Sequence, residues 1–218
     1  MAQPVFLIAP FAIGALVPAG WGYRAAKRAL DLALTLAGLL AIWPILLLVA
    51  LAIKVDTRGP VFFVQTRVGK DGRTFRIVKF RSMVAGADAM LAGLSGDRDG
   101  ICFKAKDDPR ITRIGRILRR TSLDELPQLW NVLLGQMSLV GPRPALPREV
   151  AAYPAPARAR LVALPGITGL WQVSGRADLG FDDMIALDVD YVRHPSLRRD
   201  LAILWRTLAV VLNGRGAY

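Results

Sequence analysis

Cysteine and histidine are almost absent from this chain of 218 residues, which contains only Cys102 and His194. A single cysteine excludes an intrachain disulfide, a cysteine-based zinc site and a redox pair. Any histidine-based catalytic triad would need His194, which precedes Pro195 in a basic segment and is interpreted as a bystander. The chain also lacks a Walker phosphate-binding loop and a G-x-G-x-x-G motif, so neither common nucleotide-binding signature is present.

Acidic residues are scarce: 17 Asp and Glu stand against 29 Lys and Arg, for a formal net charge of +12. At the same time, 53% of the residues are hydrophobic. A soluble nucleic-acid-binding protein would explain the charge but not this apolar composition, so nucleic acid is not expected as a partner. Contact with a membrane explains both, because basic residues bind anionic headgroups and phosphate-bearing substrates.

The first 20 residues carry no charge and contain Pro4, Pro10 and Pro18. They lack the basic segment of a signal peptide, and they are short for a membrane span. Residues 1–23 are therefore interpreted as an apolar N-terminal extension whose role stays open.

A long apolar run extends from Leu30 to Ile53, with Asp31 as its only charged residue. As a straight helix it would measure about 36 Å, enough to cross a hydrocarbon core of about 30 Å. Pro44 removes one backbone hydrogen bond and is expected to bend or break the helix. Basic residues flank both ends of the run, whereas a spanning helix carries them mainly on its cytoplasmic side. A bent spanning helix and a helix that re-enters the same leaflet both stay open.

Three polar segments have recognisable periodicity. Residues 60–83 contain two β-rich runs around a Gly-Lys-Asp-Gly turn, which predicts a hairpin. Residues 197–215 predict an amphipathic helix that either packs on the protein or lies in a membrane interface. Residues 104–120 predict a helix whose basic face is either solvated or binds phosphate or headgroups. Its apolar stripe is Ile111, Ile114 and Leu118, and its basic face is Arg113, Arg116 and Arg120.

Two adjacent carboxylates, Asp124 and Glu125, precede an apolar helical pattern. Ser122 and Glu125 have the S-x-x-E spacing of a capping box, which would make the pair a simple helix start. With Ser122 as the cap, however, Pro127 would be the fifth helical residue and would clash with the carbonyl of Leu123. Pro127 is better placed near the first helical position, with both carboxylates in the elbow before the positive end of the helix. An ionised carboxylate held there is suited to bind a metal or to attack phosphorus.

The segment 141-GPRP-144 holds one arginine between two prolines. Because proline fixes φ, Arg143 would lose little entropy on gripping a phosphate with two parallel hydrogen bonds, although arginines in such turns are often idle. Further along, 165-PGITGLWQVSGR-176 is rich in glycine and ends in Arg176, and 188-DVDYV-192 begins with Asp188.

Together these residues closely resemble the bacterial sugar transferases, the monotopic phosphoglycosyl transferases, over residues 24–218. The resemblance departs from the family at the helix break, where Trp43-Pro44 replaces a frequent Ser-Pro pair. The matching segments are 79-KFRSM-83, 107-DDPRITRIGRILRRTSLDELPQLWNVLLGQMSLVGPRP-144, 165-PGITGLWQVSGR-176, 188-DVDYV-192 and 214-GRGAY-218.

The resemblance implies that a nucleotide diphosphate sugar, such as a UDP-hexose, donates a hexose-1-phosphate to polyprenyl phosphate with release of a nucleoside monophosphate. It implies Mg²⁺ as cofactor, with Asp124 as nucleophile and metal ligand and Glu125 as the second catalytic carboxylate. The phosphate- and substrate-binding residues that it implies are Lys79, Arg81, Arg143, Arg176 and Asp188.

The resemblance also implies an α+β, mainly helical protein that is monotopic in the bacterial inner membrane and faces the cytoplasm. Residues 24–58 would form a re-entrant membrane helix broken at Pro44. Residues 59–218 would form the catalytic domain, with a small β-hairpin and interfacial amphipathic helices in contact with lipid. Homodimer formation stays open. The alternative function is a non-catalytic membrane scaffold or a basic membrane-surface binding protein, and nucleoside monophosphate release separates it from the enzyme.

Overall fold

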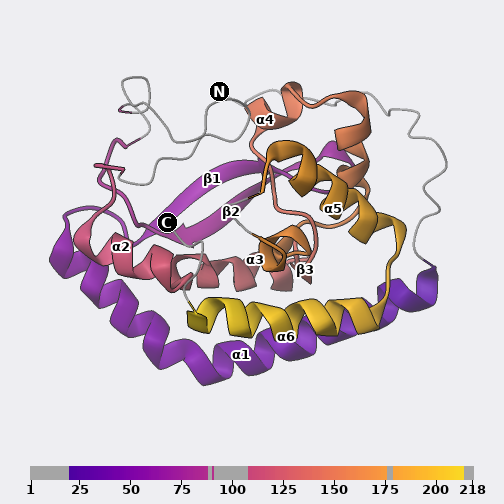
Figure 1. Cartoon of the computed structure of the whole chain (residues 1–218). Coiled ribbons are helices and arrows are strands. Elements are labelled where there is room, and N and C mark those ends of the chain that lie inside the picture. Colours follow the sequence, from indigo (N-terminus) through magenta and orange to yellow (C-terminus); the bar gives the residue numbers. More distant parts are fainter. Residues whose placement is uncertain (1–19, 88–89, 91–107, 176–178, 214–218) are drawn as a thin grey trace.

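The computed structural model describes residues 20–87, 90, 108–175 and 179–213, so Cys102, Arg176 and the C-terminal GRGAY lie outside the described residues. The chain is mainly helical with two small sheets (Figure 1). Its helices are α1 (Trp21–Asp56), α2 (Arg113–Arg120), α3 (Leu129–Leu133), α4 (Pro147–Ala151), α5 (Phe181–Arg193) and α6 (Leu197–Asn213). Its strands are β1 (Phe62–Val68), β2 (Thr74–Phe80), β3 (Ser138–Val140) and β4 (Gly166–Thr168). The 3₁₀ turns are η1 (Lys70–Gly72), η3 (Leu123–Gln128), η4 (Ala155–Val162) and η5 (Trp171–Val173).

Helix α1 continues through Pro44 instead of breaking there. A proline inside a helix removes one hydrogen bond, and the ribbon bends midway while both arms stay helical (Figure 1). Figure 1 shows both ends of α1 on the same side of the bend. Among the described residues α1 is the helix long and apolar enough to cross a membrane, and only 11% of its most apolar window is buried. Its exposed apolar residues include Leu40, Trp43, Leu48 and Val55.

Helix α6 contacts α1 near the start of both helices, and its inner face packs on β3 and α5. The carboxylate of Asp200 is fully buried and accepts hydrogen bonds from Tyr23 Oη at 2.9 Å and Lys27 Nζ at 3.1 Å. The opposite face of α6 leaves Leu201, Trp205 and Leu208 exposed. The C-terminal helix is thus both packed on the protein and apolar on its outer side.

The predicted hairpin is confirmed: β1 and β2 pair antiparallel, from Phe62 opposite Phe80 to Val68 opposite Thr74. Its turn contains Asp71 at φ 55° and Gly72 at φ 77°, a left-handed pair that suits a tight reversal. The helix predicted within residues 104–120 is shorter, because α2 begins at Arg113 and Ile111 precedes it in a β-bridge with Met83. The apolar stripe is confirmed at its other two positions. Ile114 and Leu118 pack with Val49, Ile53 and Phe80, while Arg113, Arg116 and Arg120 are exposed.

The second sheet is a parallel pair, β3 with β4, which the sequence did not predict. Strand β3 contacts α1 and α6, and the Pro-rich segment 141–144 follows it directly. Val140 of β3 packs with Tyr191 of α5 and Ile203 of α6. This short sheet therefore fixes the segment that carries Arg143 to the helices below it.

Candidate active site

The carboxylates Asp124 and Glu125 lie in the 3₁₀ turn η3, which connects α2 to α3 and packs against β2. Ser122 adopts a left-handed conformation at φ 57° and makes no side-chain cap, so the capping box does not form. Pro127 lies inside η3, two residues before α3, which agrees with the prediction that it stands near the first helical position. The 3₁₀ turn accommodates it because proline near a helix start leaves few hydrogen bonds unmade.

The two carboxylates have different surroundings. Lys79, from β2, donates a hydrogen bond of 2.6 Å to Glu125 Oε1, whereas Asp124 makes no ion pair with any described side chain. Burial alone would raise the pKa of Glu125, but Lys79 and Arg143 together hold it below its ordinary value. Burial and the neighbouring Glu125 raise the pKa of Asp124 to about 6, against the opposing charges of Lys79 and Arg119. Both carboxylates are therefore mainly ionised at neutral pH, and the charge of Asp124 is the less stabilised of the two.

Three cations surround a small hollow beside this pair. Lys79, Arg67 and Arg143 all line it, together with Glu125 and Gln128. Arg67 is buried, with its guanidinium 3.1 Å from the carbonyl oxygen of Pro144, and burial and Arg143 lower its pKa to about 10, so it remains charged. A hollow with three positive charges and one carboxylate is suited to bind a phosphate or diphosphate group.

The side chain of Arg143 is exposed and makes no hydrogen bond or ion pair with a described residue, while the prolines on either side of it are buried. The backbone of this segment is tied to β4, because Gly141 N donates to Thr168 O at 2.9 Å and Gly166 N donates to Pro142 O at 2.9 Å. A rigid backbone thus presents a guanidinium that has no described partner of its own.

Two further residues line the hollow that the sequence patterns did not indicate, Arg67 and Gln128. Arg67 is a charged residue within a strand, and strand alternation alone does not indicate which side of a two-stranded hairpin will be covered. Gln128 is fully buried, and its Nε2 has no hydrogen-bond partner. Gln128 is three residues after Glu125, which is one turn of a 3₁₀ helix, and this spacing could have indicated that both side chains lie on the same face.

Two predicted substrate-binding residues lie elsewhere. Arg81 follows β2, is buried, and donates to the carbonyl oxygens of Arg58 at 2.7 Å and Thr57 at 2.9 Å, so it closes the end of α1. Asp188 is 1% exposed and forms an ion pair with Arg160 instead of facing the hollow. It is buried because it shares the inner face of α5 with Met184 and Tyr191, at helical spacing. Arg176, also predicted, lies outside the described residues.

A magnesium ion at this site would need ligands beyond the protein. The described residues contain no group of three or more Asp, Glu, His or Cys side chains that could hold a metal. Mg²⁺ is commonly bound by one or two carboxylates together with substrate phosphates and water. Asp124, adjacent to Glu125 and without a cationic partner, fits such a shared site, and Glu125 is already paired with Lys79.

Comparison with known proteins places the chain in one family. Residues 22–214 match the family described as "Bacterial sugar transferase". The UDP-galactose-lipid carrier transferase of Erwinia amylovora is 45% identical over 204 residues, which cover 89% of this chain and 42% of that protein. The exopolysaccharide production protein ExoY of Sinorhizobium fredii is 39% identical over 215 residues, 96% of this chain and 94% of that protein.

A third relative is the UDP-glucose:undecaprenyl-phosphate glucose-1-phosphate transferase of Caulobacter vibrioides, 44% identical over 202 residues. That match covers 88% of this chain and 72% of the relative. The chain thus spans less than half the length of the Erwinia protein and nearly all of the Sinorhizobium protein. Since the family match extends over almost the whole chain, the protein belongs to the bacterial sugar transferase family.

Proposed function

We propose that the protein transfers a hexose-1-phosphate from a UDP-hexose to polyprenyl phosphate and releases UMP, the first membrane step of exopolysaccharide assembly. The observation that carries the proposal is the pair of unlike carboxylates beside three cations. Glu125 is held by Lys79 and lines the hollow with the three cations, whereas Asp124, the preceding residue in the chain, is free of ion pairs with described residues. Family membership and the names of the three relatives support the same reaction.

In the first step, a carboxylate oxygen of Asp124 attacks the phosphorus that carries the sugar. A P–O bond to that phosphorus forms, the P–O bond to the nucleotide phosphate breaks, and UMP leaves with the bonding electrons. The product is an acyl phosphate on Asp124. Arg143 and Lys79 stabilise the negative charge on the transferring group, since fixed cations at a phosphoryl group are the main source of catalysis in such transfers.

In the second step, a phosphate oxygen of the polyprenyl phosphate attacks the same phosphorus and displaces the carboxylate of Asp124. Polyprenyl diphosphate hexose forms and the carboxylate is regenerated, so the kinetics are ping-pong. Glu125 accepts a proton from the acceptor if its phosphate arrives as the monoanion. When bound by Asp124 and the substrate diphosphate, Mg²⁺ would neutralise charge that otherwise repels the nucleophile.

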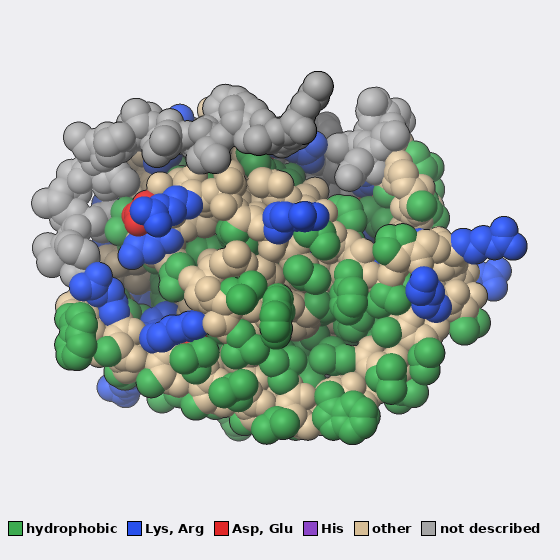
Figure 2. All heavy atoms as spheres, turned by 180° about the vertical axis from the view of Figure 1, so that it is seen from behind, with side chains coloured by type: hydrophobic (Ala, Val, Ile, Leu, Met, Phe, Trp, Pro, Cys, Tyr) green, Lys and Arg blue, Asp and Glu red, His purple; other side chains and the backbone are tan. Residues whose placement is uncertain are grey.

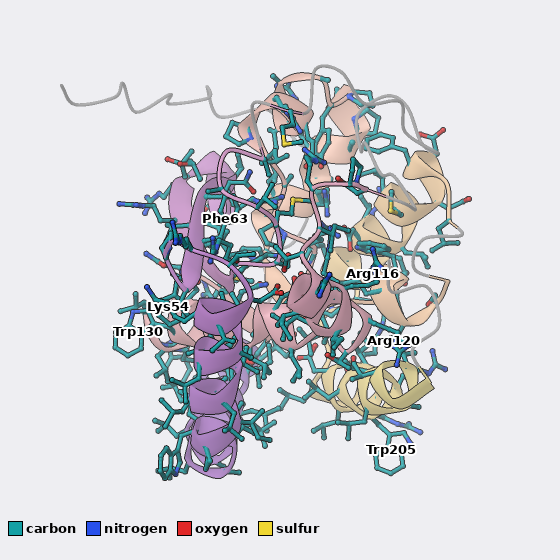
Figure 3. All side chains as sticks on the ribbon, turned by 90° about the vertical axis from the view of Figure 1, so that its left-hand side faces the viewer. Lys54, Phe63, Arg116, Arg120, Trp130 and Trp205 are labelled. Carbon is teal, nitrogen blue, oxygen red and sulfur yellow. The ribbon has the colours of Figure 1, made fainter. Side chains whose placement is uncertain are left out.

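We further propose that the protein is embedded in one leaflet on the cytoplasmic face, with α1 re-entrant. Support comes from the two ends of α1 lying on the same side of its bend (Figure 1). Figure 2 shows hydrophobic side chains gathered over the lower part of the molecule, with most Lys and Arg side chains above them or at the edges. In Figure 3, Trp205 of α6 and Trp130 of α3 project outward, and they are 74% and 57% exposed. Exposed tryptophans are typical of a membrane interface.

A panel of nucleotide sugars tests the reaction. The full chain in lipid nanodiscs would receive each sugar with or without undecaprenyl phosphate, and nucleoside monophosphate would be measured. We expect release from a UDP-hexose that depends on both substrates over many turnovers, and loss of release in Asp124→Asn. No release from any nucleotide sugar, despite intact membrane binding, would favour the non-catalytic scaffold.

A further inference from the structure

A buried ion pair lies directly beneath the segment that carries Arg143. Arg160 comes from η4 and is 6% exposed, and Asp188 comes from α5 and is 1% exposed. One nitrogen of the Arg160 guanidinium, Nη2, donates both to Asp188 Oδ2 and to the backbone carbonyl oxygen of Arg143, the latter at 3.0 Å. The other, Nη1, donates to the hydroxyl of Tyr153 at 2.6 Å.

These contacts connect the Arg143 backbone to two other elements. Tyr153 follows α4 and its ring packs against Phe181 at the start of α5, with ring centroids 5.6 Å apart. Arg160 is therefore a junction between α4, α5 and the segment 141–144. The following carbonyl, that of Pro144, accepts from Arg67 at 3.1 Å, so buried arginines hold two consecutive carbonyls of this segment.

We infer that Asp188 and Arg160 are positioning residues for Arg143: they fix its peptide plane and so aim its guanidinium at the hollow beside Glu125. The inference rests on the proposed function, because it assigns these residues to the same site. The prolines on both sides of Arg143 fix their own φ, which leaves few backbone rotations to be set. The hydrogen bond that Arg160 donates to the Arg143 carbonyl oxygen fixes the backbone rotations that the prolines leave free.

The role of Asp188 follows from its contact with Arg160. Asp188 is too deeply buried to touch a ligand in the hollow, and among the described residues its hydrogen-bond partner is Arg160. Its carboxylate holds the guanidinium in place and raises the pKa of Arg160, so the junction stays charged despite burial. A buried ion pair adds little stability compared with apolar residues of the same size, so geometry is the better explanation for retaining it.

A double-mutant cycle tests the inference through kcat/KM for the nucleotide sugar. Arg160→Lys keeps the charge beside Asp188 but cannot reach Tyr153 and the Arg143 carbonyl together. We expect a loss of about tenfold, mainly in KM, because small misplacements of a binding group weaken catalysis strongly. Arg143→Lys should lose about a hundredfold. The double variant should lose no more than Arg143→Lys alone, because residues that act through one another are not additive.

A matched control separates positioning from plain stability. Arg110 is also 6% exposed and pairs with a buried carboxylate, that of Asp108, away from the hollow. Arg110→Lys should lower the thermal midpoint about as much as Arg160→Lys, with kcat/KM unchanged. Losses that multiply in the double variant, or an equal loss in Arg110→Lys, would overturn the inference.

Hydrogen exchange gives a readout that does not depend on activity. In the full chain without substrate, Arg160→Lys and Asp188→Asn should speed amide exchange in residues 139–146, and Arg110→Lys should not. Unchanged exchange in both variants would contradict the positioning role, even if the enzyme assay fails. If exchange is faster in the two variants but the unmutated protein shows no turnover, the proposed function would be refuted. The structural role of the contact with the Arg143 backbone would then still stand.

Discussion

Asp124 and Glu125 are neighbours in the chain, yet only Glu125 has a cation within hydrogen-bond distance, Lys79 at 2.6 Å. The ion pair spreads the charge of Glu125 and makes it a poor nucleophile. Asp124 makes no ion pair with a described side chain, and burial and Glu125 raise its pKa to about 6 against the more distant charges of Lys79 and Arg119. Two chemically similar residues thus have different surroundings, which supports the proposal that one acts as nucleophile and the other as proton acceptor.

Labelling of the protein by a donor with a radioactive β-phosphate tests that division. Asp124→Asn removes the nucleophile, so we expect no label and a loss of turnover of at least about 10⁴-fold. Glu125→Gln should retain label while losing turnover, because the first step does not need its carboxylate. Label on Asp124→Asn protein, resistant to denaturation, would mean that another residue carries the intermediate.

At the residue scale, sequence patterns indicated which residues come together better than they indicated the contacts of each residue. Lys79, Glu125 and Arg143 do line one hollow, whereas Asp124 is not among the residues that line it. Lys79 and Arg81 look equivalent in 79-KFRSM-83, but β2 ends at Phe80 and Arg81 turns to the carbonyls at the end of α1. A cation that closes a helix and a cation that binds phosphate have the same sequence signature, so only the tertiary structure separates them.

At the scale of elements, α2 packs unusually close to the segment after β2. Its start is fixed by Thr112, whose hydroxyl accepts from Gly115 N at 2.9 Å, and by Asp56 of α1, which accepts from Ile114 N at 3.2 Å. The helix then approaches the backbone of Ser82, and Thr112 N donates to Ser82 O at 3.1 Å. This contact brings the end of the hairpin against the helix that leads into the Asp-Glu turn.

Gly115 makes that approach possible, and its replacement tests the packing. A Cβ at Gly115 would lie 2.7 Å from the carbonyl carbon of Ser82, which is backbone and cannot move aside cheaply. We expect Gly115→Ala to cost about 1–3 kcal/mol of stability, measured as a lower unfolding midpoint in detergent. Gly38→Ala in α1 is the control, since a Cβ there meets nothing within 4 Å and should leave the midpoint unchanged or slightly higher. Equal midpoints for the two variants would contradict this account of the interface.

At the scale of elements, hydrophobic periodicity predicts only the helices and strands that are long enough to display it. The hairpin and α2 were predictable because seven or eight residues display an alternation or a stripe. Strands β3 and β4 have three residues each, too few for any period to appear, and they pair in parallel across a long separation. Their close approach depends on Gly141 and Gly166, which the sequence presents only as turn residues.

At the scale of the whole molecule, the apolar surface and the reactive turn belong to different sides of one body. The bend of α1 and the outer face of α6 form the apolar side (Figures 1 and 3). The Asp-Glu turn, the hairpin and the Pro-rich segment are stacked above it. A polyprenyl phosphate whose chain lies in the bilayer presents its phosphate at the headgroup level, so this arrangement suits an acceptor that stays in the membrane.

The re-entrant topology proposed for α1 can be tested by labelling a cysteine at each end of the helix. Cysteines introduced as Ala25→Cys and Pro60→Cys, both exposed positions, would flank the helix in a Cys102→Ser background. If α1 re-enters the leaflet, both should react with a membrane-impermeant thiol reagent only from the cytoplasmic side. Intact and inverted vesicles make the comparison, and a known periplasmic cysteine in the same membrane provides the control for reagent access.

Replacing Pro44 should move part of the labelling at position 25 from the cytoplasmic side to the outer side. Pro44→Leu restores the missing hydrogen bond and leaves an apolar helix long enough to span, so part of the population should expose the cysteine at position 25 on the outer side. The basic residues Arg24, Lys27 and Arg28 oppose that inversion, because positive charge favours the cytoplasmic side. We therefore expect a mixture of topologies and reduced activity. Labelling of the two cysteines from opposite sides in the protein that retains Pro44 would establish a spanning helix, and the re-entrant proposal would be wrong.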